Sequence, residues 1–154
     1  MTTEQELIVV GVDGSQESVG ALAWAARYGA ACGARIHALL AWHFPSAVGP
    51  SPPGVAPESV TDEVEEERSQ QLMRAIAAGA PDAHVEPVIG YGHPAEVLVN
   101  ASREADLLVV GSRGRGAFTG MLVGSVSLHC VHHAFCPVVV VRKGTSPEAS
   151  PPAG

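Results

Sequence analysis

Lysine is almost absent from this chain of 154 residues, in which Lys143 is the only one. A P-loop needs the pattern GxxxxGK[ST], whose lysine reaches the nucleotide phosphates, so the sequence excludes that class of nucleotide site. The dinucleotide pattern GxGxxG does not follow the first apolar run, and the nucleophile-elbow pattern GxSxG is missing as well. Because no general base is visible either, nothing in the sequence predicts a vigorous enzyme.

Cysteine, signal-peptide features and long apolar runs are scarce too. The three cysteines have no CxxC spacing, and the first apolar run follows MTTEQE directly, with no basic flank or signal-peptide core. No apolar run approaches the length of about 20 residues that spans a bilayer. We therefore expect a cytoplasmic protein that has no membrane partner.

Positive charge is in short supply. Nine basic residues against sixteen acidic ones give a net charge of −7, which argues against a general nucleic-acid binder. The acids are unevenly distributed, because none lies within residues 107–147, a stretch that holds Arg113, Arg115, Arg142 and Lys143. This stretch predicts a local positive patch, suited to a small anionic ligand.

Short apolar runs alternate with helical patterns along the chain. The runs predict five strands, at residues 6–12, 34–44, 84–92, 105–112 and 136–142, and the patterns between them predict helices at about 15–33, 57–79, 94–104 and 124–134. Such alternation is typical of the α/β class, so we expect a single domain with an open parallel sheet and helices on both faces. Pro87 removes a ladder donor from the third strand, which therefore belongs at an edge of the sheet.

Two segments lack regular patterns. Residues 44–57 contain five prolines and two glycines and predict an irregular loop, and residues 144–154 predict a disordered C-terminal tail. We expect the domain itself to span residues 1–143.

Two of the predicted strands end in unusual chemistry: the first in GVDGS (11–15) and the fourth in GSRGRG (111–116). In open parallel sheets, ligands bind beyond the carboxyl ends of the strands where the strand order reverses, and the order 3-2-1-4-5 brings both segments to one such crevice. GSVS (124–127) predicts a helix start whose N–H groups suit phosphate oxygens. Asp13 and Glu17 would repel phosphate, so we expect Asp13 to face a nucleoside hydroxyl, a base edge or a phosphate-bound Mg²⁺, unless it only fixes the turn.

The glycine spacing in this region resembles a known signature. The pattern Gly111-x-x-Gly114, nine residues, then Gly124-Ser125 is similar to the ATP-binding signature G-2x-G-9x-G-(S/T) of the universal stress protein family. The segments IVVGVDGSQES, ADLLVVGSRGRG and CPVVVVR also resemble that family, and the likeness covers residues 5–143. The resemblance implies a sheet of order 3-2-1-4-5, a homodimer, and binding of ATP, with Mg²⁺, in stress adaptation or signalling.

Carried over position by position, the resemblance implies a set of nucleotide-binding residues. The nucleoside would contact Asp13 and the backbone at Gly11 and Val12, and Ala41 would flank the adenine. Val110 and Gly111 would meet the base and the ribose. The residues implied to hold the phosphates are Gly114, Gly124, Ser125, Val126 and Ser127. Arg113 occupies a position that varies in the family, and it would add charge pairing.

Three other functions are compatible with the same residues. One is a slow ATPase or autophosphorylating enzyme, with Ser125 or Ser127 near the γ-phosphate. Another keeps the fold and binds cyclic AMP or a different adenine nucleotide. The third is a ligand-free dimer that docks a partner.

The fifth predicted strand is apolar, and no proline or charge guards its middle residues 138–141. Pairing of the 136–142 edge with a second copy would cover this strand and supports a homodimer. The C-terminal tail could cover the edge instead.

The segment HCVHH (129–133) raises the question of a metal site. Histidines are favoured near the negative end of a helix dipole, cysteines behave as small apolar residues, and no third ligand is fixed by the spacing. We therefore expect no metal ligand in this segment.

Overall fold

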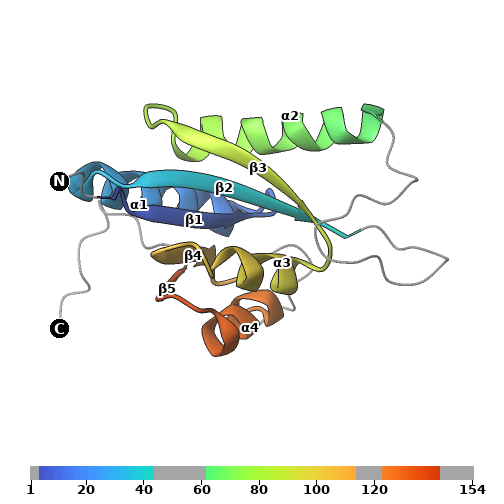
Figure 1. Cartoon of the computed structure of the whole chain (residues 1–154). Coiled ribbons are helices and arrows are strands. Elements are labelled where there is room, and N and C mark those ends of the chain that lie inside the picture. The colour runs from blue at the N-terminus through green and yellow to red at the C-terminus, as the bar shows by residue number, and fades with distance from the viewer. Residues whose placement is uncertain (1–3, 44–61, 114–122, 143–154) are drawn as a thin grey trace, which may run out of the picture.

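The computed structural model describes residues 4–43, 62–113 and 123–142. Over these ranges strands and helices alternate in the order β1 (Leu7–Val12), α1 (Gln16–Cys32), β2 (Arg35–Trp42), α2 (Asp62–Gly79), β3 (Val85–Tyr91), α3 (Pro94–Ala101), β4 (Leu107–Gly111), α4 (Ser125–His133) and β5 (Val138–Val141). The strands form one parallel sheet in the order β3-β2-β1-β4-β5 (Figure 1). The predicted α/β class and strand order are confirmed.

Helices cover both faces of this sheet. Figure 1 shows α1 behind the strands, with α3 and α4 on the near side and below. The core on the α1 and α2 face includes Ile8, Val10, Leu22, Leu72 and Val109. The core on the α3 and α4 face comprises Val9, Leu39, Leu98, Leu108, Val110 and Cys130. Because successive side chains of β1 and β4 are buried on opposite faces, both strands consist of nearly continuous apolar residues.

The two edges of the sheet differ in character. β3 lies at one edge, where Glu86 and Pro87 are exposed, so the position predicted from Pro87 is confirmed. β5 lies at the other edge and consists of four valines, of which Val141 is buried and the rest are half-buried.

Most helix boundaries follow the predicted signals. Ser15 is the N-cap of α1, and Pro94 opens α3 as its first residue. α3 ends at Ala101, earlier than the predicted residue 104, because the N–H groups of Arg103 and Glu104 bond to carbonyls three residues back and so tighten the chain into turns. The predicted start of the second helix at residue 57 lies outside the described residues.

Helix length and composition bear on membranes as well. Within the described ranges, none of the helices combines the length and the apolar character that crossing a membrane requires.

Gly79 of α2 packs closely against α1, and this contact leads to a prediction about stability. A Cβ atom on Gly79 would lie 2.7 Å from the carbonyl oxygen of Val19 and 2.8 Å from Cβ of Leu22, whereas one on Gly20 would only approach Val141 Cγ1 at 3.8 Å. We expect Gly79→Ala to destabilise the fold by about 1–3 kcal/mol through overpacking. Gly20→Ala, the matched control, should stabilise it by about 0.5–1 kcal/mol through helix propensity. Urea unfolding measures both values, and a stabilising Gly79→Ala would contradict the close packing.

Candidate nucleotide site

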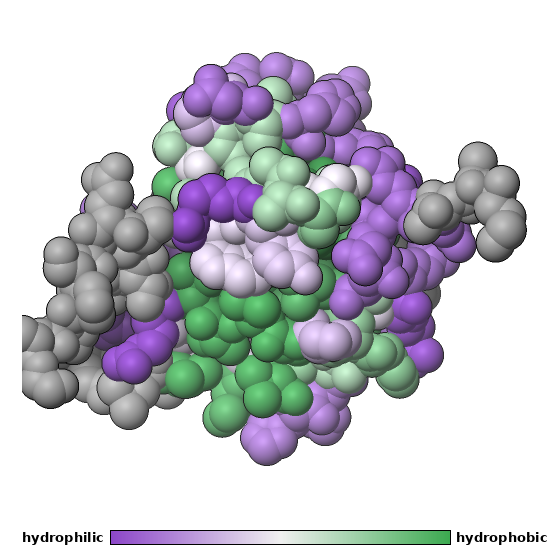
Figure 2. Space-filling model, turned by 90° about the vertical axis from the view of Figure 1, so that its left-hand side faces the viewer, coloured by the Kyte–Doolittle hydropathy of each residue, from purple (hydrophilic) through white to green (hydrophobic). Residues whose placement is uncertain are grey.

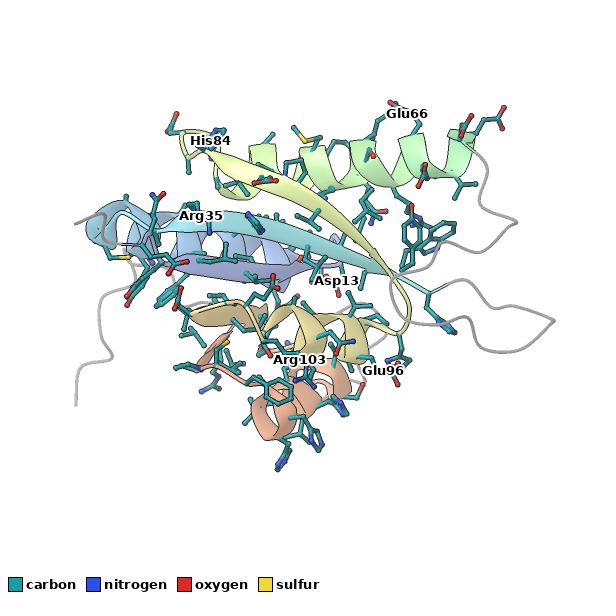
Figure 3. All side chains as sticks on the ribbon, viewed as in Figure 1. Asp13, Arg35, Glu66, His84, Glu96 and Arg103 are labelled. Atoms are coloured by element: carbon teal, nitrogen blue, oxygen red, sulfur yellow. The ribbon has the colours of Figure 1, made fainter. Side chains whose placement is uncertain are left out.

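The carboxyl ends of the strands meet at one end of the sheet. Figure 3 shows Asp13 and Glu96 at this end, and Arg35 and His84 at the opposite one. The register of β1 with β2 pairs Val12 with Leu40. Since Asp13 and Ala41 are the next residues along, they continue at the same level.

The register of β1 with β4 brings a second segment to this level. Val10 pairs with Val109. Continued by two residues, this pairing sets Val12 level with Gly111, the last residue of β4. The residues that follow β1 and β4 therefore leave the sheet side by side.

Asp13 fixes the turn between β1 and α1. Its Oδ1 atom accepts a hydrogen bond of 2.9 Å from the N–H of Ser15. Ser15 in turn caps α1, because its hydroxyl oxygen accepts the N–H of Ser18 at 3.2 Å. Gly14 takes a φ of 83°, in the left-handed region that favours glycine. One carboxylate oxygen of Asp13 therefore has a role in the turn.

The segment that leaves β4 is held at three points. The carbonyl of Gly111 accepts the hydroxyl of Ser127. The N–H of Ser112 donates to the carbonyl of Val141 at 2.8 Å, and the carbonyl of Ser112 accepts the N–H of Gly124 at 2.5 Å. Because Gly124 and Ser127 belong to the start of α4, that helix begins directly beside the end of β4.

The first turn of α4 offers backbone donors at this place. Gly124 is the N-cap and has no side-chain capping bond, and the N–H of Leu128 makes the bond to the Gly124 carbonyl at 2.9 Å. The N–H groups of Ser125, Val126 and Ser127 precede that bond and are the donors that a helix start presents to an anion. No acidic residue lies in this turn.

The two serines of this turn differ. Ser125 is exposed, whereas the side chain of Ser127 is buried and donates its hydroxyl proton to Gly111. The Ser127 hydroxyl therefore joins α4 to β4. Since phosphate oxygens accept hydrogen bonds, the predicted phosphate contact of Ser127 would have to come from its backbone N–H.

Arg113 pairs with α1. Its guanidinium lies 3.7 Å from the carboxylate of Glu17, and the two side chains are 32% and 15% exposed. The predicted positive patch is therefore partly neutralised by an acid that is distant in the sequence. Of the other cations of that patch, Arg142 is exposed, and Arg115 and Lys143 lie outside the described residues.

Ala41 and Trp42 lie on opposite faces of β2. Ala41 is half-buried and shares the α3 face with Leu39. Trp42 instead contacts Arg68 of α2, whose guanidinium lies 5.2 Å from the indole centroid, and Tyr91 of β3, at 6.2 Å between rings. A hydrogen bond to Glu65 of α2 raises the pKa of Tyr91 to about 12. This aromatic cluster ties α2 to the ends of β2 and β3, beside the candidate site.

All but one of the predicted binding residues lie within the described ranges. Gly114 lies outside the described residues, so its role stays a prediction. The others lie at the carboxyl ends of β1, β2 and β4 or at the start of α4: Gly11, Val12, Asp13, Ala41, Val110, Gly111, Arg113, Gly124, Ser125, Val126 and Ser127.

The HCVHH segment forms the second half of α4. Cys130 is fully buried in the apolar core, and burial raises the pKa of its thiol to about 11, as expected for a small apolar residue. The rings of His129 and His133 lie 4.4 Å apart on the exposed side of the helix. In the part of the chain that the structure describes, no group of three or more His, Cys, Asp or Glu residues is arranged to hold a metal ion.

Comparison with known proteins identifies the family. Residues 6–142 match the model of the universal stress protein family. The chain belongs to the universal stress protein family. Universal stress protein Rv2623 of Mycobacterium tuberculosis is 38% identical over 144 residues, which cover 91% of this chain and 46% of that protein. The chain thus spans about half the length of the curated relatives it matches.

Solved universal stress proteins share the fold. The universal stress protein UspA of Lactobacillus plantarum superposes with a TM-score of 0.67 at 22% identity, over 92% of this chain and 100% of that one. A universal stress protein solved in complex with cyclic AMP superposes with a TM-score of 0.56 at 30% identity, over 88% of this chain and 95% of that one.

Two residues outside the predicted set, Ser18 and Glu17, contact residues of the candidate site. Ser18 is buried and its hydroxyl donates to the carbonyl of Ser15 at 2.9 Å, while its oxygen lies 3.4 Å from the N–H of Asp13. The spacing of Ser15 and Ser18, three apart at a helix start, is the signal that could have identified it. Glu17 has no such signal for its pairing with Arg113, because the two residues belong to different elements.

The different surroundings of Ser125 and Ser127 lead to a prediction about the stability of their alanine variants. Ser127→Ala removes a buried hydroxyl and leaves the Gly111 carbonyl with one partner fewer, so we expect a loss of about 1–3 kcal/mol in stability. Ser125→Ala changes an exposed side chain and should stay within about 0.5 kcal/mol of the wild type. Urea unfolding of both variants tests the difference, and equal stabilities would argue against the bond from Ser127 to Gly111.

Proposed function

We propose that this universal stress protein binds an adenine nucleotide, ATP with Mg²⁺, beyond the carboxyl ends of β1 and β4, and acts in stress adaptation in the cytoplasm. The observation that carries the proposal is the start of α4, which is fixed beside the end of β4 by the bonds of Ser112 and Ser127. Three consecutive backbone N–H groups, with no acid in their turn, suit the phosphates.

The nucleoside would lie on the β1 and β2 side of the same place. Ala41 is small and half-buried, which leaves room for the flat face of a base, and Asp13 is level with it. The Asp13 carboxylate suits a ribose hydroxyl or a phosphate-bound Mg²⁺. Binding of cyclic AMP by a solved relative at 30% identity supports an adenine nucleotide in general. The glycine spacing supports ATP in particular.

Nucleotide released from the purified protein tests this function directly. The protein is purified from cells, denatured, and the supernatant is examined by mass spectrometry, with calorimetry of added ATP, AMP and cyclic AMP alongside. We expect ATP to be released and to bind. Release of cyclic AMP would transfer the proposal to that ligand, and a protein that is empty and binds none of the three would overturn it. Accumulation of ADP and phosphate over time would indicate the slow ATPase instead.

Asp13→Asn tests the role of the carboxylate. The amide oxygen of asparagine preserves the acceptor for the N–H of Ser15, so we expect the melting temperature to stay within about 2 °C of the wild type. Loss of the charge should weaken binding of Mg²⁺-ATP about tenfold or more, and of adenosine less. Asp13→Ala, which also removes the acceptor, should lower both the affinity and the melting temperature. If Asp13→Asn binds ATP with unchanged affinity, the Asp13 carboxylate has a role in the turn alone and none in nucleotide binding.

A homodimer through β5 is the second part of the proposal. The carbonyl of Pro137 accepts the N–H of Leu108 in β4, and that of Val141 accepts the N–H of Ser112, which follows β4. Because backbone groups alternate in direction along a strand, Val138 and Val140 point their N–H and C=O groups away from the sheet. In Figure 2, apolar side chains gather in the lower half of the face shown, at the height of β4, β5 and α4 in Figure 1. An apolar edge strand with outward-facing backbone groups suits a second copy.

Val140→Pro tests this interface. Proline removes an outward N–H, and the ladder bonds that β5 makes with β4 belong to the alternate residues, so the fold should be retained. We expect the wild type to sediment as a dimer and Val140→Pro to sediment as a monomer, with unchanged helical circular dichroism. A monomeric wild type, or a variant that stays dimeric, would contradict pairing through this edge.

A further inference from the structure

Glu17 occupies an unusual place for an acid, beside a proposed phosphate site. A Cβ atom on Gly111 would lie 2.8 Å from both the carbonyl carbon and Cβ of Glu17, so the first turn of α1 touches the end of β4 with no side chain between them. The Glu17 side chain is only 15% exposed. Its position is therefore set by packing of the backbone.

Arg113 is the cation that faces this acid. The two side chains are 3.7 Å apart, which is longer than the 2.7–2.9 Å typical of a charge-assisted hydrogen bond. The contact is thus a loose ion pair. A phosphate group, which accepts arginine in a bidentate manner, is a better partner for a guanidinium.

Arg113 stands close to the place proposed for the phosphates. It follows Ser112, whose carbonyl accepts the N–H of Gly124 at 2.5 Å, and Gly124 is the N-cap of α4. The stem of Arg113 therefore starts beside the helix that offers its backbone N–H groups, while its guanidinium is turned toward α1. Glu17 and a nucleotide phosphate would compete for the same guanidinium.

We propose that Glu17 is a specificity-determining residue, which competes with nucleotide phosphates for Arg113 and so lowers the affinity most for nucleotides that carry the most phosphate charge. This inference rests on the proposed nucleotide binding. Glu17 acts in two ways: it holds Arg113 in the free protein, and it repels phosphate once Arg113 has changed partner. Both effects grow with the number of phosphates and are absent for a nucleoside.

Glu17→Gln tests the competition, because it is nearly isosteric and removes only the charge. Calorimetry with ATP, AMP and adenosine is compared for the wild type and the variant. We expect Glu17→Gln to bind ATP about 3- to 10-fold more tightly and AMP with a smaller gain, while adenosine stays within about twofold. The matched control is Glu104→Gln, an exposed acid that shortly precedes Asp106, which bonds Leu7 at the far end of the sheet. It should change none of the three affinities by more than about twofold.

A double-variant cycle identifies Arg113 as the group competed for. Arg113→Gln should weaken ATP binding. Adding Glu17→Gln to the Arg113→Gln variant should then raise the ATP affinity by a smaller factor than Glu17→Gln does in the wild type. Melting temperatures of all variants separate a change in packing from a change in charge. If the effects of the two substitutions on ATP affinity are additive, Glu17 and the phosphates do not compete for Arg113, and the inference is overturned.

The outcomes also separate this inference from the proposed function. If the wild type binds ATP but Glu17→Gln binds it no more tightly, or gains as much for adenosine as for ATP, the inference falls and nucleotide binding stands. If the wild type binds none of the three ligands, both are overturned.

Discussion

Contact between the end of β4 and the first turn of α1 is the constraint on which the candidate site depends. Gly111 has no side chain to separate them, and a Cβ atom there would lie 3.0 Å or less from three atoms of Glu17. α1 thus occupies one face of the sheet beside Gly111, and α4 packs against the other face. The bonds of Ser112 to Gly124 and of Ser127 to Gly111 fix this connection. Ser112 and Gly124 are thereby held together beside the end of β4.

Local patterns were sufficient to predict the scaffold. The apolar runs of β1 and β4 are continuous because both faces of each strand are covered, and Pro87 marks an edge strand because it has no N–H to donate. Ser15 caps α1 through a bond that spans three residues. Each of these features depends on residues that are close in the sequence. Each can therefore be predicted from a single sequence without a structure.

Contacts between distant elements could not be predicted in the same way. The stretch around Arg113 has no acid in its sequence, yet its guanidinium meets Glu17 of a different element. Ser127 has the pattern of an exposed helix-start serine, but the turn of α4 directs it inward to Gly111. Trp42 follows Ala41 directly but lies on the opposite face of β2, against Arg68. Which face or partner a side chain takes depends on helix placement, and that is decided by packing of the whole core.

The balance of charge bears on how this acidic protein would hold the proposed nucleotide. With Arg113 paired to Glu17, the positive element at the start of α4 is the backbone, whose dipole is equivalent to about half an elementary charge. Such a fixed partial charge attracts any phosphate and distinguishes poorly between one phosphate and three. Discrimination by phosphate number requires a full charge that changes partner on binding. Among the residues described around the start of α4, Arg113 is a full positive charge that already faces a carboxylate. Under the proposed function, the phosphate selectivity of the site would therefore depend on how firmly Glu17 holds Arg113.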